Sequence, residues 1–414
     1  MIQVHGITSP GESPHVSSDK DAALAVVGEF AQEIDPVVEK RVLRKIDLYL
    51  MPAMLVGYGM VYYDKAILGS ATLFGMTTDL GLLVKDNSTT PPSVDTSRLS
   101  WATSIFYFGM LTGLYPMTFI LQRFNTRTVL GPVVLTWAIV CAATAGVSTW
   151  HGLFVQRFFL EERRVAVERL RKGQTGVRCQ KIKFNQIKES VMDIKIYLVA
   201  IMMAAAYTIN GAISGFGPLI VSTFGYDTLH SILFQFPVGG ICVIFIPLCG
   251  YISTVIPNIR IPLLITCCLP VIAGCAMIWK SQWAYHPVIP VIGYALTGFF
   301  GPVVSLVIAV GASNVAGATK KTVMAATVFV AYTIGNIIGP QLVKSNTKSQ
   351  HYPELWTGMI ICYCITITAA VVLYLVLRRE NRIRESLELD EVQRDKIAFD
   401  DLTDKQNPFF RYAL

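Results

Sequence analysis

Long apolar runs repeat along most of the chain and constrain its fold more than any other feature. An α-helix rises 1.5 Å per residue, so a run of about 20 apolar residues can cross a hydrocarbon core of roughly 30 Å. Such runs lie at 48–73, 101–121, 129–147, 196–222, 230–255, 261–279, 288–312, 323–343 and 355–377. Hydrophobic residues make up 53% of the 414 residues and charged residues only 15%. The sequence therefore predicts an all-α, multi-pass integral membrane protein in a lipid bilayer.

The positive charges lie in short loops and tails between these runs. Their distribution is typical of orientation in a membrane and argues against nucleic-acid binding, although the net charge is +7. Arg41, Arg44 and Lys45 precede the first run, which predicts a cytoplasmic N-terminus. Further arginines follow the last run, so the C-terminus is predicted on the same side. We interpret Lys320 and Lys321, in a turn between two runs, mainly as topology determinants.

A further apolar run, at 151–160, is too short to span. It is interrupted by Arg157 and ends at Glu161, so it covers only about half of a bilayer core. The N-terminal half therefore holds about three and a half spans, and six complete spans follow.

The predicted domains are a cytoplasmic tail, an N-terminal transmembrane half, a cytoplasmic linker, a C-terminal transmembrane half and a second cytoplasmic tail. They cover 1–45, 46–160, 161–195, 196–378 and 379–414. The last tail alternates in charge, which predicts a short surface helix before Asn407.

Three ionisable residues in or near apolar runs are candidates for a binding site, because burying a charge in a membrane costs several kcal/mol unless it is compensated. Asp64 and Lys65 lie in the outer part of the first span, either in a binding site or with their charged ends at the external interface. Arg157 fits a bidentate contact with a substrate carboxylate, or it anchors the end of its short run.

Polar residues also recur on single helix faces. Tyr207 and Asn210 share a face of the span at 196–222, and Tyr332 and Asn336 share one of the span at 323–343. These faces suit the wall of a cavity, or they form hydrogen bonds between packed helices. Gln235 is a weaker candidate.

Enzyme motifs are missing from the sequence. The histidines and cysteines show no metal-ligand spacing, and no glycine-rich phosphate loop with its lysine occurs. We therefore expect no catalytic residues, no metal and no cofactor.

Several motifs together resemble one family. They are DK in the first span, RFFL in the short run, NGAISGFGPLIVSTFGYDTLHSILFQFPVGG, SNVAGATKK, GNIIGPQ and the closing DLTDKQNPFFRYAL. This pattern resembles the fungal allantoate permease family, anion:cation symporters of the major facilitator superfamily. The resemblance implies a helical bundle of two six-helix halves that takes up small, often carboxylated nutrients such as allantoate, nicotinate or pantothenate, usually with protons.

The chain departs from the family pattern where Leu160 joins Glu161 directly. The rest of the fourth helix and all of helices five and six are missing there, which leaves an incomplete N-terminal half and a complete C-terminal half.

The sequence thus leaves two functions open. The first is proton-coupled uptake of a small organic anion across the plasma membrane by alternating access. Asp64 would carry the proton, and Lys65, Arg157 and the polar faces would bind the substrate. The second is a truncated, transport-incompetent isoform or gene-model fragment of such a transporter. Association with a second protomer could fill the gap.

Overall fold

The computed structural model describes residues 36–86, 93–123, 126–162, 183–281, 283, 288–344, 347, 350–386 and 401–414. Most of the predicted N-terminal tail, most of the predicted linker and part of the C-terminal tail lie outside these residues.

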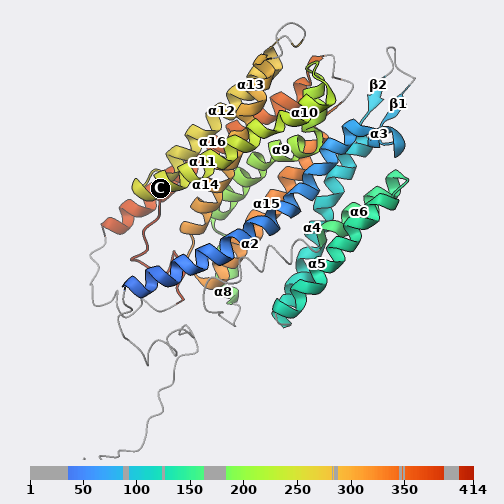
Figure 1. Cartoon of the computed structure of the whole chain (residues 1–414). Helices are drawn as coiled ribbons and strands as arrows, with labels where there is room; N and C mark the ends of the chain where they lie inside the picture. The colour runs from blue at the N-terminus through green and yellow to red at the C-terminus, as the bar shows by residue number, and fades with distance from the viewer. Residues whose placement is uncertain are drawn as a thin grey trace, which may run out of the picture.

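The C-terminal half contains six spans that are long and apolar enough to cross a membrane, by length and composition, within the described residues. They are α9 (Ile194–Ser222), α10 (Thr228–Leu233) with α11 (Gln235–Val255), α12 (Arg260–Lys280), α13 (Val288–Leu296) with η3 (Thr297–Phe299) and α14 (Phe300–Ser313), α15 (Ala318–Gln341), and α16 (Pro353–Glu385). These spans coincide with the six apolar runs predicted between 196 and 377. In Figure 1, α9 lies inside the bundle, and it packs against α14, α15 and α16.

The N-terminal half has fewer long helices than the C-terminal half among the described residues. Its longer helices are α2 (Pro36–Ala71), α4 (Ser97–Arg123), α5 (Thr126–Ala143) and α6 (Trp150–Glu162). Between α2 and α4 lie η1 (Thr72–Phe74), α3 (Met76–Asp79) and a small antiparallel pair, β1 (Val84–Asp86) and β2 (Ser93–Asp95). With 13 residues, α6 is somewhat longer than the predicted run. It still extends only about 20 Å, which is less than the roughly 30 Å of a bilayer core.

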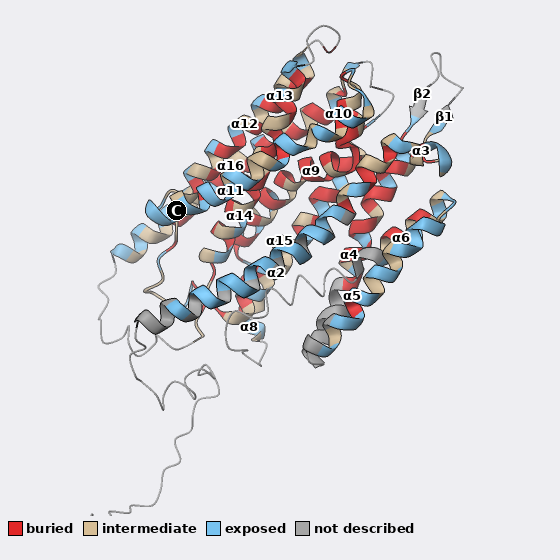
Figure 2. Ribbon diagram, in the orientation of Figure 1, coloured by how far each residue is buried: buried red, intermediate tan, exposed pale blue. Residues whose placement is uncertain are grey.

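The bundle has two ends with different elements, as Figure 1 shows. The strands β1 and β2 and the helix α3 mark the hairpin end, and α8 (Phe184–Val191), which follows the predicted linker, marks the linker end. The buried residues gather on α9 and on the helix faces that surround it (Figure 2).

Small residues allow α9 and α15 to approach closely. A Cβ atom at Gly211 of α9 would lie 2.7 Å from the carbonyl oxygen of Asn336 in α15. A Cβ atom at Gly335 of α15 would lie even closer, within van der Waals overlap of the carbonyl oxygen of Ala204 in α9. Any side chain at these positions would push the helices apart, so the small residues fix the interface at the centre of the bundle.

The two halves meet toward the hairpin end through hydroxyl groups. Ser100 and Ser104 of α4 donate hydrogen bonds of 3.0 and 3.2 Å to the carbonyl oxygens of Pro340 and Ile337 in α15. Thr96 donates one of 3.2 Å to the carbonyl oxygen of Val343. Pro340 lies in the last turn of α15, where carbonyl groups lack partners within the helix, and Ser100 of the other half supplies one. The halves are thus in contact at the hairpin end.

The part of α2 nearer the linker end is widely exposed. Leu48, Tyr49 and Leu55 expose 68, 77 and 75% of their surface, and a Cβ atom at Gly57 or Gly59 would have no neighbour within 4 Å. Large apolar side chains in this position need either lipid or another helix as a partner.

The C-terminal segment at 401–414 forms turns and irregular backbone. Helix α16 ends at Glu385, and residues 387–400 lie outside the described residues. The predicted surface helix before Asn407 therefore stays a prediction. The segment at 401–414 is held by hydrogen bonds to neighbouring elements, as described below.

Candidate functional site

Lys65 of α2 lies inside the protein and not at its surface. Its side chain is only 6% exposed, and its ammonium group donates a hydrogen bond of 2.9 Å to Oδ1 of Asn210 in α9. The same ammonium group lies 5.5 and 5.3 Å from the ring centres of Tyr62 and Tyr107, within the range of cation–π attraction. The alternative that Lys65 extends to the external interface is therefore wrong. The Asp64 side chain lies outside the described part of the structure.

Arg157 faces the same cavity as Lys65. It is 7% exposed and comes from the short helix α6. The cavity is small, about 10 Å³, which is roughly the space of one water molecule, and it is partly open to the surroundings. Its lining comes from α2, α4, α6 and α9: Lys65, Leu68, Thr103, Phe106, Tyr107, Arg157, Ser214 and Gly215. Two buried cations from different helices thus point into one cavity between the halves.

Asn336 links α15 to the same region. It is fully buried, and its Oδ1 accepts a hydrogen bond of 2.9 Å from the hydroxyl group of Tyr107. Its amide nitrogen donates one of 2.8 Å to the carbonyl oxygen of Tyr332. The Tyr332 ring packs edge-on against Tyr107 and Tyr207, with centre distances of 6.0 and 4.5 Å. The two predicted polar faces therefore meet beside the cavity, next to Lys65 and its partner Asn210.

Gln235 lies in a separate interaction. Its Oε1 accepts a hydrogen bond of 2.7 Å from the hydroxyl group of Tyr294 in α13, and it does not line the cavity. This contact holds α13 against the start of α11 inside the C-terminal half.

Sequence reasoning missed Tyr107, which contacts both Lys65 and Asn336. A signal was available, because Ser100, Ser104 and Tyr107 recur at intervals of four and three residues on one face of α4. In the structure, all three side chains donate hydrogen bonds to α15.

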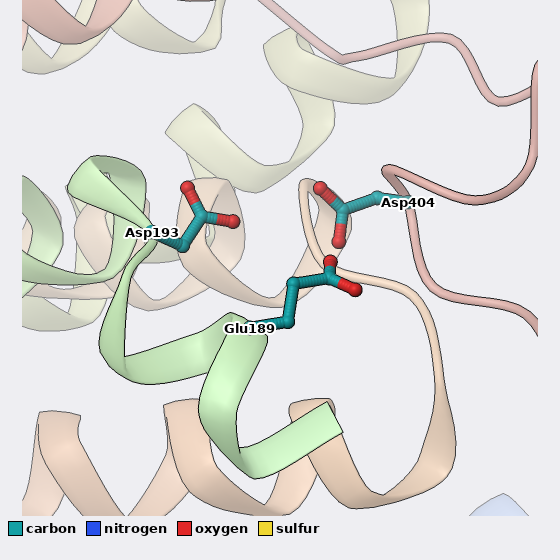
Figure 3. A group of neighbouring side chains, drawn as sticks. All are labelled: Glu189, Asp193 and Asp404. Carbon is teal, nitrogen blue, oxygen red and sulfur yellow. The ribbon is translucent and has the colours of Figure 1, made fainter. Parts of the chain in front are cut away.

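A second polar cluster lies at the linker end. Figure 3 shows the carboxylates of Glu189, Asp193 and Asp404 pointing toward one another. The ammonium group of Lys320 lies 2.8, 2.7 and 2.7 Å from these three side chains. A lysine thus occupies the position that a metal ion would need. Lys320 is fully buried, so it is more than the topology determinant that the sequence suggested.

Comparison with known proteins identifies relatives along almost the whole chain, although no family model matches. An uncharacterized transporter of Schizosaccharomyces pombe, C757.13, is 28% identical over 503 residues and covers 97% of this chain and 93% of its own length. The MFS-type transporter cnsL of Penicillium expansum is 25% identical, and the alignment covers 96% of this chain and 94% of the relative. Allantoate permease of Saccharomyces cerevisiae is 24% identical, and the alignment covers 99% of this chain and 93% of the relative.

Solved structures give the fold. A D-xylose–proton symporter superimposes with a TM-score of 0.54 at 13% identity, covering 78% of this chain and 97% of its own. A bacterial homologue of the lysosomal transporter Spinster, in an inward-facing and occupied conformation, gives 0.53 at 10% identity, covering 80 and 96%. The chain has a major facilitator fold.

These findings confirm several predictions. The chain is a multi-pass integral membrane protein of the predicted helical, major facilitator fold class. Its relatives are named as transporters and permeases and not as enzymes, which agrees with the missing enzyme motifs.

Proposed function

We propose that the chain is a secondary transporter for a small organic anion, of the allantoate permease type. The observation that carries this proposal is the cavity that contains both Lys65 and Arg157. A planar carboxylate binds well to a guanidinium group with two parallel hydrogen bonds, and an ammonium group nearby adds a second charge-assisted bond. Asn210, Tyr107 and the neighbouring tyrosines provide neutral donors and an aromatic surface suited to the rest of a small carboxylated nutrient.

The contacts between halves support alternating access. The hydroxyl groups of α4 bind α15 toward the hairpin end, and the cavity lies deeper, between α2, α4, α6 and α9. Transport would break these contacts and open the cavity at the hairpin end, as the two halves rock about the central site. The hairpin end would then be external, with both termini in the cytoplasm and the protein in the plasma membrane.

Asp64 is the proposed proton carrier. It neighbours Lys65 in the sequence, and a carboxylate that takes up a proton would offset the charge of an anionic substrate. The coupling ion is therefore proposed to be H⁺.

A second function is favoured by the incomplete N-terminal half. The alignment with the S. pombe relative extends over 503 positions. The aligned part of this chain, 97% of 414 residues, is only about 400 residues long, so about 100 aligned positions have no residue in this chain. The short α6 and the exposed side of α2 are where additional helices would pack. These observations support a form that lacks part of the fourth helix and the fifth and sixth helices. Such a form would not transport unless another chain, such as a second protomer, covered α2.

An uptake assay separates the two functions. Labelled allantoate, nicotinate and pantothenate are offered to cells that lack their own carriers, and surface expression is measured in parallel. The transporter predicts uptake of at least one substrate that stops with a proton uncoupler and with the R157Q variant. The K344A variant is a matched control, because Lys344 lies near the surface in an exposed ion pair. No uptake at normal surface expression would reject the transporter and favour the truncated form.

A further inference from the structure

The end of the chain, residues 401–414, is buried although it forms neither helix nor strand. Thr403 and Asp404 have no exposed surface, and Tyr412 exposes only 2%. Irregular backbone can be buried only where its polar groups find partners, because unpaired amide and carbonyl groups cost free energy. The segment is therefore an element of the fold and not a free tail.

Two asparagine side chains form paired hydrogen bonds with the backbone of the segment at 401–414. Asn381 of α16 donates to the carbonyl oxygen of Tyr412 and accepts from its amide, both at 2.9 Å. Asn314, after α14, makes the same two bonds to Ala413 at 2.9 and 2.8 Å. The backbone amide of Arg260 donates to the carbonyl oxygen of Leu414 at 3.0 Å. Three separate parts of the C-terminal bundle thus hold the last residues.

Charged groups hold the middle of the segment. The two carboxylate oxygens of Asp404 lie 2.7 Å from Lys195 at the start of α9 and 2.7 Å from Lys320 of α15. Tyr412 donates to Asp404 at 2.9 Å and accepts from Lys195 at 2.6 Å. Asp404 therefore joins the starts of two central helices through two buried lysines.

The beginning of the segment reaches α8. Asp401 accepts a hydrogen bond of 2.7 Å from the amide of Ala318 at the start of α15, and it lies 3.4 Å from the ammonium group of Lys183. Gln186 of α8 donates to Asp401 and accepts from the amide of Thr319 at 3.0 Å. The segment thus ties the helix that follows the linker to the start of α15.

We propose that residues 401–414 are a C-terminal clamp, an intramolecular peptide ligand bound at the linker end of α8, α9, α15 and α16. In the described part of the chain, its hydrogen bonds and ion pairs go to α8 and to the C-terminal bundle. The clamp therefore fixes the end of the linker to this bundle and makes both move as one rigid body. This inference does not depend on the proposed function.

The test is digestion of the detergent-solubilised full chain with carboxypeptidase, followed by intact mass. A bound clamp predicts that the native protein is trimmed at least about tenfold more slowly than the heat-denatured protein, because cleavage requires the segment to be released. Equal trimming rates would overturn the proposal.

Two variants test the role of Asp404. D404N keeps the shape of the side chain and removes its charge, and it should be trimmed several-fold faster than the native protein. K321A is the control, because Lys321 is exposed and lies outside the segment, and it should behave as the native protein. Equal rates for D404N and K321A would overturn the role of Asp404. If D404N does not accumulate, the comparison of native and denatured protein still decides the proposal.

Discussion

The central cavity and the linker-end cluster both bury lysines, but they surround them differently. At the linker end, Lys320 contacts three carboxylates at 2.7 to 2.8 Å. At the cavity, the contacts of Lys65 with described residues are a hydrogen bond to the neutral amide of Asn210 and the faces of two tyrosine rings. A buried ion pair is costly to break, whereas a bond to a neutral amide is more easily exchanged for one to a substrate carboxylate. The first arrangement therefore suits structure, and the second suits binding.

The largest expected effect is the loss of Lys320. K320A would leave Asp193 and Asp404, which are buried, and the partly buried Glu189 without this ammonium group. Removing one partner of a buried ion pair typically costs about 3–5 kcal/mol. We expect little folded protein, or a strongly lowered melting temperature in detergent. The control is K321A, because Lys321 is exposed and its replacement should change stability by less than about 0.5 kcal/mol. Equal stability of the two variants would contradict a structural role for the cluster.

The next effect falls on transport and not on stability. K65Q removes a charge-assisted hydrogen bond to the anion, worth about 1.5–3 kcal/mol, which corresponds to roughly a 10- to 100-fold loss of uptake at low substrate concentration. Because Gln keeps a donor for Asn210, the melting temperature should change little. Uptake by K344A should equal that of the native protein. A K65Q variant with native uptake would remove Lys65 from the binding site.

A smaller effect is expected where the halves meet. S100A removes one hydroxyl bond to the carbonyl oxygen of Pro340, which typically contributes about 1 kcal/mol. The matched control is T112A on the same helix, whose hydroxyl group bonds only to carbonyl oxygens of its own helix in the described contacts. Thermal unfolding should show a lower midpoint for S100A than for T112A. The reverse order would argue against the contact.

The smallest effect concerns pH. Burial alone raises the pKa of Asp404, but Lys195 and Lys320 outweigh it and hold this pKa below its usual value. Glu189, Asp193, Glu380, Arg384, Lys405 and Tyr412 are the other ionisable groups around the cluster. A carboxyl group with a lowered pKa stabilises the folded state above its unfolded pKa of about 3.9, and this contribution is lost as the pH falls through the folded value.

The stability difference between the native protein and D404N should therefore stay constant from pH 8 to pH 5 and shrink only below about pH 4. Melting temperatures of both proteins across this range provide the measurement. A difference that shrinks between pH 8 and pH 6 would mean that Asp404 does not stay ionised there.

The sequence predicted the helices well because a membrane restricts spans to long apolar helices, which leave a clear pattern. Lys65, Asn210 and Asn336 could be selected as candidates because polar groups inside such helices are uncommon, and the structure places them close together. It could not show that Lys65 pairs with Asn210, because the two residues are 145 positions apart and pair only through packing.

The charge cluster was harder to predict for a physical reason. Lys320 and Asp404 lie in polar stretches where charges are usually solvated, and no periodic pattern links such segments. The bonds of Asn314 and Asn381 to the segment at 401–414 were equally hard to predict, because the two asparagines come from distant parts of the chain.

The proposed transport function depends most on the binding of a carboxylate by Lys65 in the cavity. N210D tests it directly, because a carboxylate 2.9 Å from Lys65 would form an internal ion pair there and make the cavity resemble the linker-end cluster. The measurement is the thermal shift that allantoate, nicotinate and pantothenate cause in detergent-purified protein. We predict that at least one of them raises the melting temperature of the native protein and none raises that of N210D. Equal shifts in both proteins, or no shift in the native protein, would contradict the claim.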